Sequence, residues 1–359
     1  MESVSKRISK VFKGTRAEVI FLMNTNLTDS NFLYLTGFTS GIFEQNPLIV
    51  TKNGLILPVS PLEYEIAKEQ RPKGMRIIKA KGKEEMDSVV KRYLKGKVVG
   101  INASFLPYKY YQMLKKTAKP KQIIDVSKCF YDARLVKDES EISNIKIANR
   151  IAKSALAAAK AGLKSGMTER QLAARVEYLM LEKGANGIAF RTIVAFDSNS
   201  ALPHHMPDGT RLRPNSIVLI DIGAKYNNYC SDITRTFIFR PDRRSGKYSK
   251  FMEIYKIVKD AQLIGCKAIK DGAPAMNAHM AAEGHINTAL RGRYKGRFIH
   301  SLGHAIGLDV HDLGFRLSTV EKLKANMVVS DEPGIYVVGF GGVRIEDDVI
   351  VTKNGAIML

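Results

Sequence analysis

Short apolar runs alternate with amphipathic stretches over residues 1–130, a pattern that indicates strands alternating with helices. The run 19–22 predicts a buried strand, and Asp29 with Ser30 offers an N-cap for a short helix that Gly37 ends. The segment 52–54 carries Asn-Gly between two apolar runs and predicts a hairpin. Further helices are expected at 61–70, 84–94 and 107–117, and further strands at 75–79, 98–102 and 122–126. This order predicts a small α/β domain with a mixed sheet.

The pattern changes after residue 130, where helices and strands segregate. Apolar positions at helical spacing run from Glu139 to about Leu163, and Thr168 with Gln171 forms a capping box that opens a second helix. Strands are expected from about Phe190, followed by helices near 246–271 and 274–291 and by strands to the C-terminus. We therefore predict an α+β protein with a boundary between domains at 1–130 and 131–359.

Composition narrows the class of protein. A chain of 359 residues with 45% hydrophobic residues fits two globular domains and excludes wholesale disorder. Lys and Arg outnumber Asp and Glu by 56 to 35, so the formal charge is +21 and nucleic acid is a first hypothesis for a partner. Three scattered cysteines fit a reducing compartment. No signal peptide or membrane-length apolar run is readable, and we expect a cytoplasmic protein without membrane contact.

Two acidic residues interrupt neighbouring apolar runs in the second domain. Asp221 lies in the run 217–223, and Asp232 lies in the run 229–237. A hairpin that turns at 226–227 would place the two carboxylates opposite each other, unless a bulge shifts the pairing. Like charges at opposed positions repel, so this arrangement is unfavourable without a cation between them.

A second pair of strand-like runs repeats this arrangement near the C-terminus. Glu332 and Glu346 lie at equal distances from Gly339, and a bend there would bring them together. His304 lies between the two hairpins in a glycine-rich segment, and strand alternation would place His300 on its face. Four carboxylates and one imidazole suit Mn²⁺, Co²⁺, Fe²⁺ or Zn²⁺.

These residues also carry a family resemblance. The motifs Ala-Leu-Pro-His at 201–204, Ser-Asp-Ile-Thr-Arg-Thr at 231–236, Glu-Pro-Gly-Ile-Tyr at 332–336 and Gly-Val-Arg-Ile-Glu-Asp at 342–347 resemble those of the pita-bread metallopeptidases. That family includes methionine aminopeptidase, aminopeptidase P and prolidase. The segment 34–38 resembles the creatinase-type N-terminal domain, which methionine aminopeptidase lacks.

The resemblance implies a site with two divalent metal ions per chain. Asp221 would chelate one ion, His304 and Glu332 would chelate the other, and Asp232 and Glu346 would bridge both. A metal-bridging hydroxide would then hydrolyse the bond before proline, with Glu332 handling its proton.

The resemblance also implies roles around the metals. His204 and His311 would stabilise the tetrahedral intermediate and pass protons to the leaving nitrogen, and Thr234 would orient Asp232. Arg316 and Arg344 are candidates for binding the substrate carboxylate.

Three positions depart from the family pattern. Ala305 stands where Gly is usual and is tolerable if its φ stays negative, Asp312 stands where Glu is commoner, and Asp331 precedes Glu332 where Val or Ile is expected. Strand alternation would point Asp331 away from Glu332.

Three functions remain open at this stage. The compact chain favours a prolidase that cleaves Xaa-Pro dipeptides, the alternative is an aminopeptidase P that acts on longer Xaa-Pro peptides, and a non-catalytic binding module for RNA or protein is a third. The family resemblance implies a homodimer. Residues 1–130 carry 23 basic and 11 acidic side chains, so the charge excess is heaviest outside the proposed chemistry. We therefore expect a solvated surface and no nucleic-acid partner.

Overall fold

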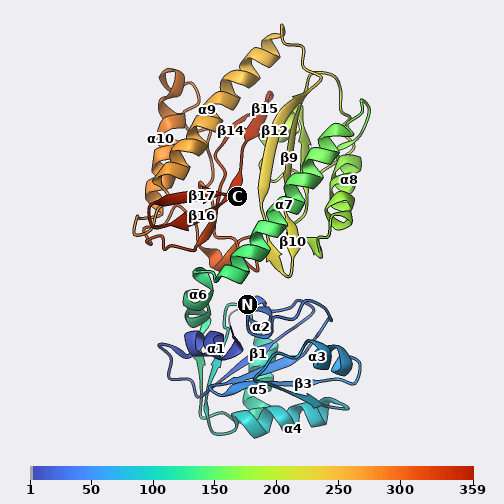
Figure 1. The fold of residues 1–359 in the computed structure, drawn as a ribbon, viewed down its shortest axis with the longest axis vertical. Helices are drawn as coiled ribbons and strands as arrows, with labels where there is room; N and C mark the ends of the chain where they lie inside the picture. The colour runs from blue at the N-terminus through green and yellow to red at the C-terminus, as the bar shows by residue number, and fades with distance from the viewer. Residues whose placement is uncertain (1–2) are drawn as a thin grey trace. The chain divides into compact units, whose positions relative to one another are not determined.

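The computed structural model describes residues 3–359, which divide into two compact units, Met1–Leu135 and Val136–Leu359 (Figure 1). The division lies after Leu135 and not after residue 130 because helix α6 (Ser127–Leu135) belongs to the first unit. The hydroxyl of Tyr34 donates to the backbone oxygen of Ala133 on that helix, and Arg134 donates to the side chain of Asn31.

A six-stranded mixed sheet forms the centre of the first unit. Its strands run in the order β4-β3-β2-β1-β5-β6. Pairs β1–β2 and β2–β3 are antiparallel, whereas β3–β4, β1–β5 and β5–β6 are parallel. The strands are β1 (Val19–Met23), β2 (Pro47–Thr51), β3 (Gly54–Val59), β4 (Met75–Lys79), β5 (Val98–Ile101) and β6 (Gln122–Asp125). The mixed sheet expected from the sequence is confirmed.

Helices cover both faces of this sheet, with α1 and α2 opposite α4 in Figure 1. Apolar residues of α4 and α5 pack with buried residues of β1 and β5 in one core. The side chain of Asp29 caps α2, and Gly37 ends it with a φ of 69°. The helices are α1 (Val4–Phe12), α2 (Ser30–Thr36), α3 (Tyr64–Gln70), α4 (Lys83–Leu94) and α5 (Tyr108–Ala118).

The second unit contains two helix pairs and several small antiparallel sheets, as expected for an α+β domain. Its first half comprises α7 (Glu139–Ala161), α8 (Glu169–Glu182), β7 (Gly187–Ile188), β8 (Ile193–Phe196), the 3₁₀ helix η1 (Asp197–Ala201), β9 (Ser216–Ile222), β10 (Ala224–Tyr226), β11 (Tyr229–Cys230) and β12 (Ile233–Phe239). Its second half comprises α9 (Gly246–Ala268), α10 (Met276–Gly292), η2 (Asp312–Gly314), β13 (Val328–Asp331), β14 (Gly334–Val337), β15 (Gly341–Arg344), β16 (Asp347–Thr352) and β17 (Gly355–Met358).

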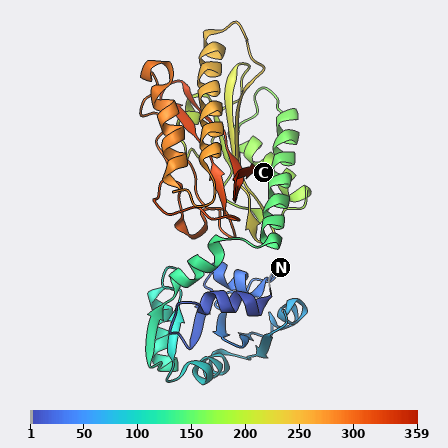
Figure 2. The same cartoon turned by 60° about the vertical axis from the view of Figure 1, so that its left-hand side comes forward.

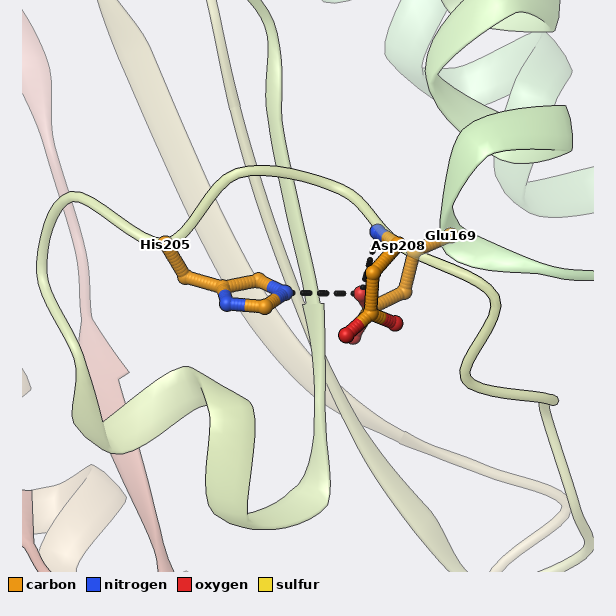
Figure 3. Close-up of side chains that lie close together, drawn as sticks. All are labelled: Glu169, His205 and Asp208. Carbon is orange, nitrogen blue, oxygen red and sulfur yellow. Dashed lines mark hydrogen bonds and ion pairs between the residues drawn. The ribbon is translucent and has the colours of Figure 1, made fainter.

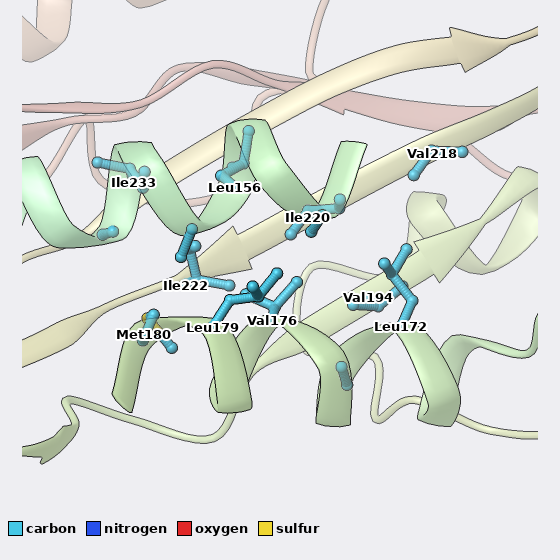
Figure 4. Close-up of a cluster of buried hydrophobic side chains, with 14 of the residues drawn as sticks. Leu156, Leu172, Val176, Leu179, Met180, Val194, Val218, Ile220, Ile222 and Ile233 are labelled. Atoms are coloured by element: carbon cyan, nitrogen blue, oxygen red, sulfur yellow. The ribbon is translucent and has the colours of Figure 1, made fainter. Parts of the chain in front are cut away.

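Both halves of this unit pack a helix pair against antiparallel strands. Leu172 and Val176 of α8 meet Val194 and Ile220 of the β12-β9-β8 sheet in a buried apolar core (Figure 4). Helices α9 and α10 run beside each other (Figure 2), and α9 packs against β13, β14, β15 and β17 of the same half. This duplication places one hairpin from each half near the same point. Across residues 3–359, no helix combines the length and the apolar composition that crossing a membrane requires.

The register of the first hairpin differs from the expected one. The turn lies at Asn227 and Asn228, both with positive φ, which a tight two-residue turn requires. Asp221 therefore pairs with Thr234 and not with Asp232. Asp232 lies between β11, which pairs with β10, and β12, which pairs with β9, and it belongs to neither ladder. The expected opposition of the two aspartates is wrong because a turn one residue later shifts the whole ladder.

The second hairpin has the expected register. Gly334 pairs with Arg344 and Ile335 with Val343, so the bend lies at Gly339, which has a φ of 80°. An isolated bridge between Thr234 and Glu346 then joins this hairpin to the first.

Candidate metal centre

The five expected ligands converge where the two halves of the second unit meet. Ligand atoms of Asp232, His304 and Glu346 all lie within 4.8 Å of one another. His304 Nε2 is 3.6 Å from Asp232 Oδ2 and 3.4 Å from Glu332 Oε1. Asp221 lies close enough for its charge to raise the pKa of Asp232, Glu332 and Glu346.

Burial and mutual repulsion make this group of acids unfavourable without cations. Burial first, and then the charges of Glu346 and Asp221, hold the pKa of Asp232 well above its ordinary value. Burial and the charge of Glu332 do the same for the pKa of Glu346. Burial raises the pKa of Glu332 to about 8, although Arg344 opposes the shift. Divalent cations would remove this penalty by replacing the protons.

Two details of the donor set fit divalent metal ions. The buried atoms Asp221 Oδ1 and Asp232 Oδ1 have no hydrogen-bond partner within the described residues. His304 Nδ1 lies 3.3 Å from its neighbouring carbonyl, that of Ala305, which favours a proton on Nδ1 and a free lone pair on Nε2 towards the acids. Oxygen donors with one imidazole match the metals that the sequence suggested.

Backbone contacts position His304. Its amide donates to Ser330 Oγ at 3.0 Å, and Ser330 Oγ donates to Glu332 Oε1 at 3.2 Å. A Cβ at Gly303 would lie 2.0 Å from the carbonyl oxygen of Ser330, so only glycine fits there. Ala305 keeps a negative φ, so its methyl group is tolerated. Ser330 therefore contacts two of the candidate ligands, and no sequence motif indicated it.

Thr234 forms its hydrogen bond with Glu346 and not with Asp232, the residue it was expected to orient. Its hydroxyl donates to Glu346 Oε2 at 2.6 Å and accepts from Arg344 Nε at 3.2 Å. Asp232 is instead held through its backbone amide, which donates to Asp348 Oδ2 at 3.0 Å. The shifted hairpin register explains this exchange, because it places Thr234 beside Asp221 and Glu346.

Arg344 organises the site from within. Arg344 is 3% exposed, and its guanidinium donates to Asp221, to the hydroxyl of Tyr336 at 2.9 Å and to Thr234. The same tyrosine hydroxyl lies 2.8 Å from His300 Nε2. Three of the five N–H groups of Arg344 are therefore engaged by the protein, which favours a supporting role over the expected contact with substrate.

The other candidate residues are His311, Arg316 and His204, and all three are exposed. The rings of His304 and His311 are 4.1 Å apart and edge-on. Burial first, and then the charges of Arg316 and His204, lower the pKa of His311. Arg316 is exposed and forms a backbone bridge with His304. His204 is exposed as well, and its charge also contributes to a lowered pKa of His300, after burial and Arg344.

The two departures among the acidic residues have separate explanations. Asp312 forms a buried ion pair with Lys137 at 3.2 Å, and each side chain is 1% exposed, so this aspartate anchors the segment that follows His311. Asp331 is buried on the strand face towards Gly265 of α9, as the alternation predicted. Burial holds the pKa of Asp331 well above its ordinary value.

Comparisons with known proteins agree with this geometry. Residues 143–353 match the family described as "Metallopeptidase family M24", and residues 6–136 match the "Creatinase/Prolidase N-terminal domain". An Xaa-Pro dipeptidase from Pyrococcus horikoshii is 37% identical over 357 residues, covering 99% of this chain and 95% of the relative.

Two solved structures have closely similar folds. The prolidase from Pyrococcus horikoshii OT3 has a TM-score of 0.86 at 36% identity, covering 99% of this chain and 97% of that one. An X-Pro aminopeptidase from Thermotoga maritima MSB8 has a TM-score of 0.86 at 29% identity and covers 97% of each chain.

Proposed function

The chain belongs to metallopeptidase family M24, and we propose that it is an Xaa-Pro dipeptidase that uses two divalent metal ions. The observation that carries the proposal is the cluster of Asp232, His304, Glu332 and Glu346, with Asp221 near enough for its charge to raise the pKa of the other three acids. A non-catalytic binding module has no need of such a site, whose acids repel one another without cations.

The residues divide into those that hold metal and those that serve the substrate. Asp221, Asp232, His304, Glu332 and Glu346 would hold the ions. Cations bound there would supply Lewis-acid polarisation of the scissile carbonyl and a nucleophile at neutral pH. Mn²⁺, Co²⁺, Fe²⁺ and Zn²⁺ all suit these donors.

Proton transfer falls to side chains around the cluster. Glu332 is the least buried of the acids, with 16% of its side chain exposed, and is placed to accept the proton of the attacking water. His311 has a lowered pKa, so it is neutral at pH 7 and offers one N–H to the developing oxyanion. The bond before proline leaves a nitrogen that must be protonated, and we assign to His204 and His311 the relay of the proton that Glu332 takes from the water.

Arg316 gives the proposal its dipeptidase character. Arg316 is exposed, and its charge lowers the pKa of both His304 and His311, so it lies on the surface near the two imidazoles. A dipeptide places its proline carboxylate within a few ångströms of the scissile bond, where an arginine binds it with two hydrogen bonds. A longer peptide has an amide at that place.

Substrate length tests this assignment. We expect a metal-dependent cleavage of an Xaa-Pro dipeptide that exceeds cleavage of the same dipeptide with an amidated C-terminus. Arg316→Met should raise KM for the free dipeptide about tenfold or more and leave the amide unaffected, because a charge-assisted hydrogen bond contributes about 1.5–3 kcal/mol. No cleavage with any of the four metals would refute the peptidase proposal.

The aminopeptidase alternative rests on the likeness to the Thermotoga maritima structure. It predicts that an Xaa-Pro-Yaa tripeptide is cleaved at least as fast as the dipeptide and that Arg316→Met leaves both rates unchanged. That result would replace the dipeptidase with an aminopeptidase on the same metal centre.

A further inference from the structure

The segment that carries His204 is exposed to solvent. Leu202 and Met206 on either side of it are 56% and 47% exposed, and His204 itself is exposed. Packing of these side chains therefore does not fix the position of the histidine. On the N-terminal side the amide of Gly342 donates to Ser200 Oγ at 2.8 Å and holds the end of η1. The C-terminal side needs a separate anchor.

One buried carboxylate provides that anchor. Glu169 is the first residue of α8 and is fully buried, and its two oxygens accept four hydrogen bonds. Figure 3 shows His205 and Asp208 meeting it from the segment. The four donors are the amide of Phe196 at 2.7 Å, Asn199 Nδ2 at 3.0 Å, His205 Nε2 at 2.7 Å and the amide of Asp208 at 3.0 Å.

The donors lie on both sides of His204 along the chain. Phe196 and Asn199 precede it and bond to Oε1, whereas His205 and Asp208 follow it and bond to Oε2. One rigid side chain at the start of a helix thus ties together the two ends of the segment. We call these five residues the Glu169 clamp, made of Glu169, Phe196, Asn199, His205 and Asp208.

The clamp is not a cation site. Ligand atoms of Glu169, His205 and Asp208 lie within 4.8 Å of one another. Both oxygens of Glu169 already face N–H donors, and Asp208 Oδ1 accepts from the amide of Thr210 at 2.6 Å. A cation would have to displace these donors, two of which on Glu169 are fixed backbone amides.

We propose that Glu169, acting through His205 and the amide of Asp208, is a positioning residue that holds His204 over the metal centre. The inference rests on the proposed function for the role of His204, and Glu169 touches no reacting atom. Glu169 contacts residues on both sides of His204, so its loss would release both ends of the segment. Misplacement of a reacting group by about 1 Å can cost about a hundredfold in rate.

The matched substitutions follow from the four hydrogen bonds. Glu169→Gln keeps the shape but has one acceptor oxygen, so two of the four donors face an amide NH₂. His205→Ala removes one donor, whereas His205→Gln restores an N–H at a similar reach. Glu182→Gln is the control, because Glu182 is exposed at the other end of the same helix.

A double-mutant cycle with His204 gives the decisive measurement. We expect Glu169→Gln to lower kcat for an Xaa-Pro dipeptide about ten- to a hundredfold with KM changed less than about threefold. In a His204→Ala background the same substitution should change kcat less than about twofold, because the effect passes through His204. Equal losses in both backgrounds would overturn the proposal, as would no loss in either.

Two further readouts keep the test decisive. If Glu169→Gln does not fold, the proposal requires that His205→Ala lower kcat and that His205→Gln recover most of the loss; equal activities of the two variants would refute it. Histidine-selective NMR needs no substrate, and the His204 ring signal should shift or broaden in Glu169→Gln while that of His279 stays unchanged. An unchanged His204 signal sinks the positioning role, whereas absence of peptidase activity in the wild type sinks only the proposed function.

Discussion

Replacing Arg344 by methionine removes a buried cation from among the acids of the metal centre. Arg344 is 3% exposed, and its guanidinium donates hydrogen bonds to Asp221 of β9, Thr234 of β12 and Tyr336 of β14. Methionine fills a similar volume without donors. Asp221 then keeps a buried carboxylate whose Oδ1 already has no partner among residues 3–359.

The expected cost in stability is large for a single substitution. Removing one partner of a buried ion pair costs about 3–5 kcal/mol, because it leaves an uncompensated charge. The hydrogen bonds to Thr234 and Tyr336 are lost as well, at about 1 kcal/mol each for neutral acceptors. A domain has only about 5–15 kcal/mol of stability, so the metal-free variant should be strongly destabilised. Arg344→Lys keeps the charge but not the planar guanidinium, so its stability should lie between those of the wild type and Arg344→Met.

Urea unfolding with and without metal tests this reasoning. We expect Arg344→Met to lower the unfolding midpoint strongly in chelator and less in Mn²⁺, because bound cations supply the missing positive charge. Arg293→Met is the matched control, since Arg293 forms an exposed pair with Glu253 at 2.9 Å and its loss should change the midpoint little. A metal-free Arg344→Met protein as stable as the wild type would refute the electrostatic account of the site.

Two other predictions follow from the same geometry. In the metal-free protein, burial raises the pKa of Glu332 from 4.5 to about 8 and that of Asp348 from 3.8 to about 7, so unfolding releases protons and the urea midpoint should fall as pH rises from about 4 to about 8. Saturating metal should weaken or reverse this slope, and a midpoint that rises with pH in chelator would contradict the shifts. Gly303→Ala should lower stability and metal affinity, because its Cβ would lie 2.0 Å from the carbonyl oxygen of Ser330, whereas Gly284→Ala in an open helical position should stabilise the protein by up to about 1 kcal/mol. Calorimetry and metal titration of both alanine variants check this, and an undisturbed Gly303→Ala protein would show that the contact relaxes.

Local patterns predicted the elements well because each end carries its own chemical signal. The predicted capping box of Thr168 with Gln171 starts α8, and Gly37 ends α2 as expected. The five candidate metal ligands were proposed from motifs that resemble those of the pita-bread metallopeptidases, and the four acidic ones stood out because acidic residues inside buried strands are rare without a partner. The signals at the ends of elements come from residues close together in the sequence, whereas the candidate ligands are spread over residues 221–346 and were proposed from separate motifs.

The predicted register of the first hairpin was wrong because it depends on which of two adjacent residue pairs forms the turn. Asn227 and Asn228 both adopt positive φ, whereas the expected turn used Tyr226, whose ring disfavours that conformation. A shift of one residue in the turn moved Thr234 opposite Asp221 and made it a partner of Glu346. The sequence did contain this signal, because asparagine tolerates the left-handed region better than tyrosine.

Long-range partners were beyond sequence reasoning for a different reason. Glu169 lies at the start of a helix, where an acidic residue is common and needs no further explanation. Its buried contacts with His205 and Asp208 arise only when α8 packs beside the His204 segment. The sequence likewise makes Arg344 a candidate for binding the substrate carboxylate and gives no sign of its bonds to Thr234, Tyr336 and Asp221.

The acid cluster links the stability of this fold to its chemistry. Asp232 and Glu346 are buried close together, and burial with repulsion among the acids raises the pKa of both carboxyl groups, which favours their protonated forms in the metal-free protein. Cations that replace those protons bind only the folded chain, because the unfolded chain does not bring the five ligands together. Metal at a hundred times its Kd would then stabilise the fold by about 2.7 kcal/mol. The repulsion that weakens the metal-free site is therefore the same force that selects divalent cations for it.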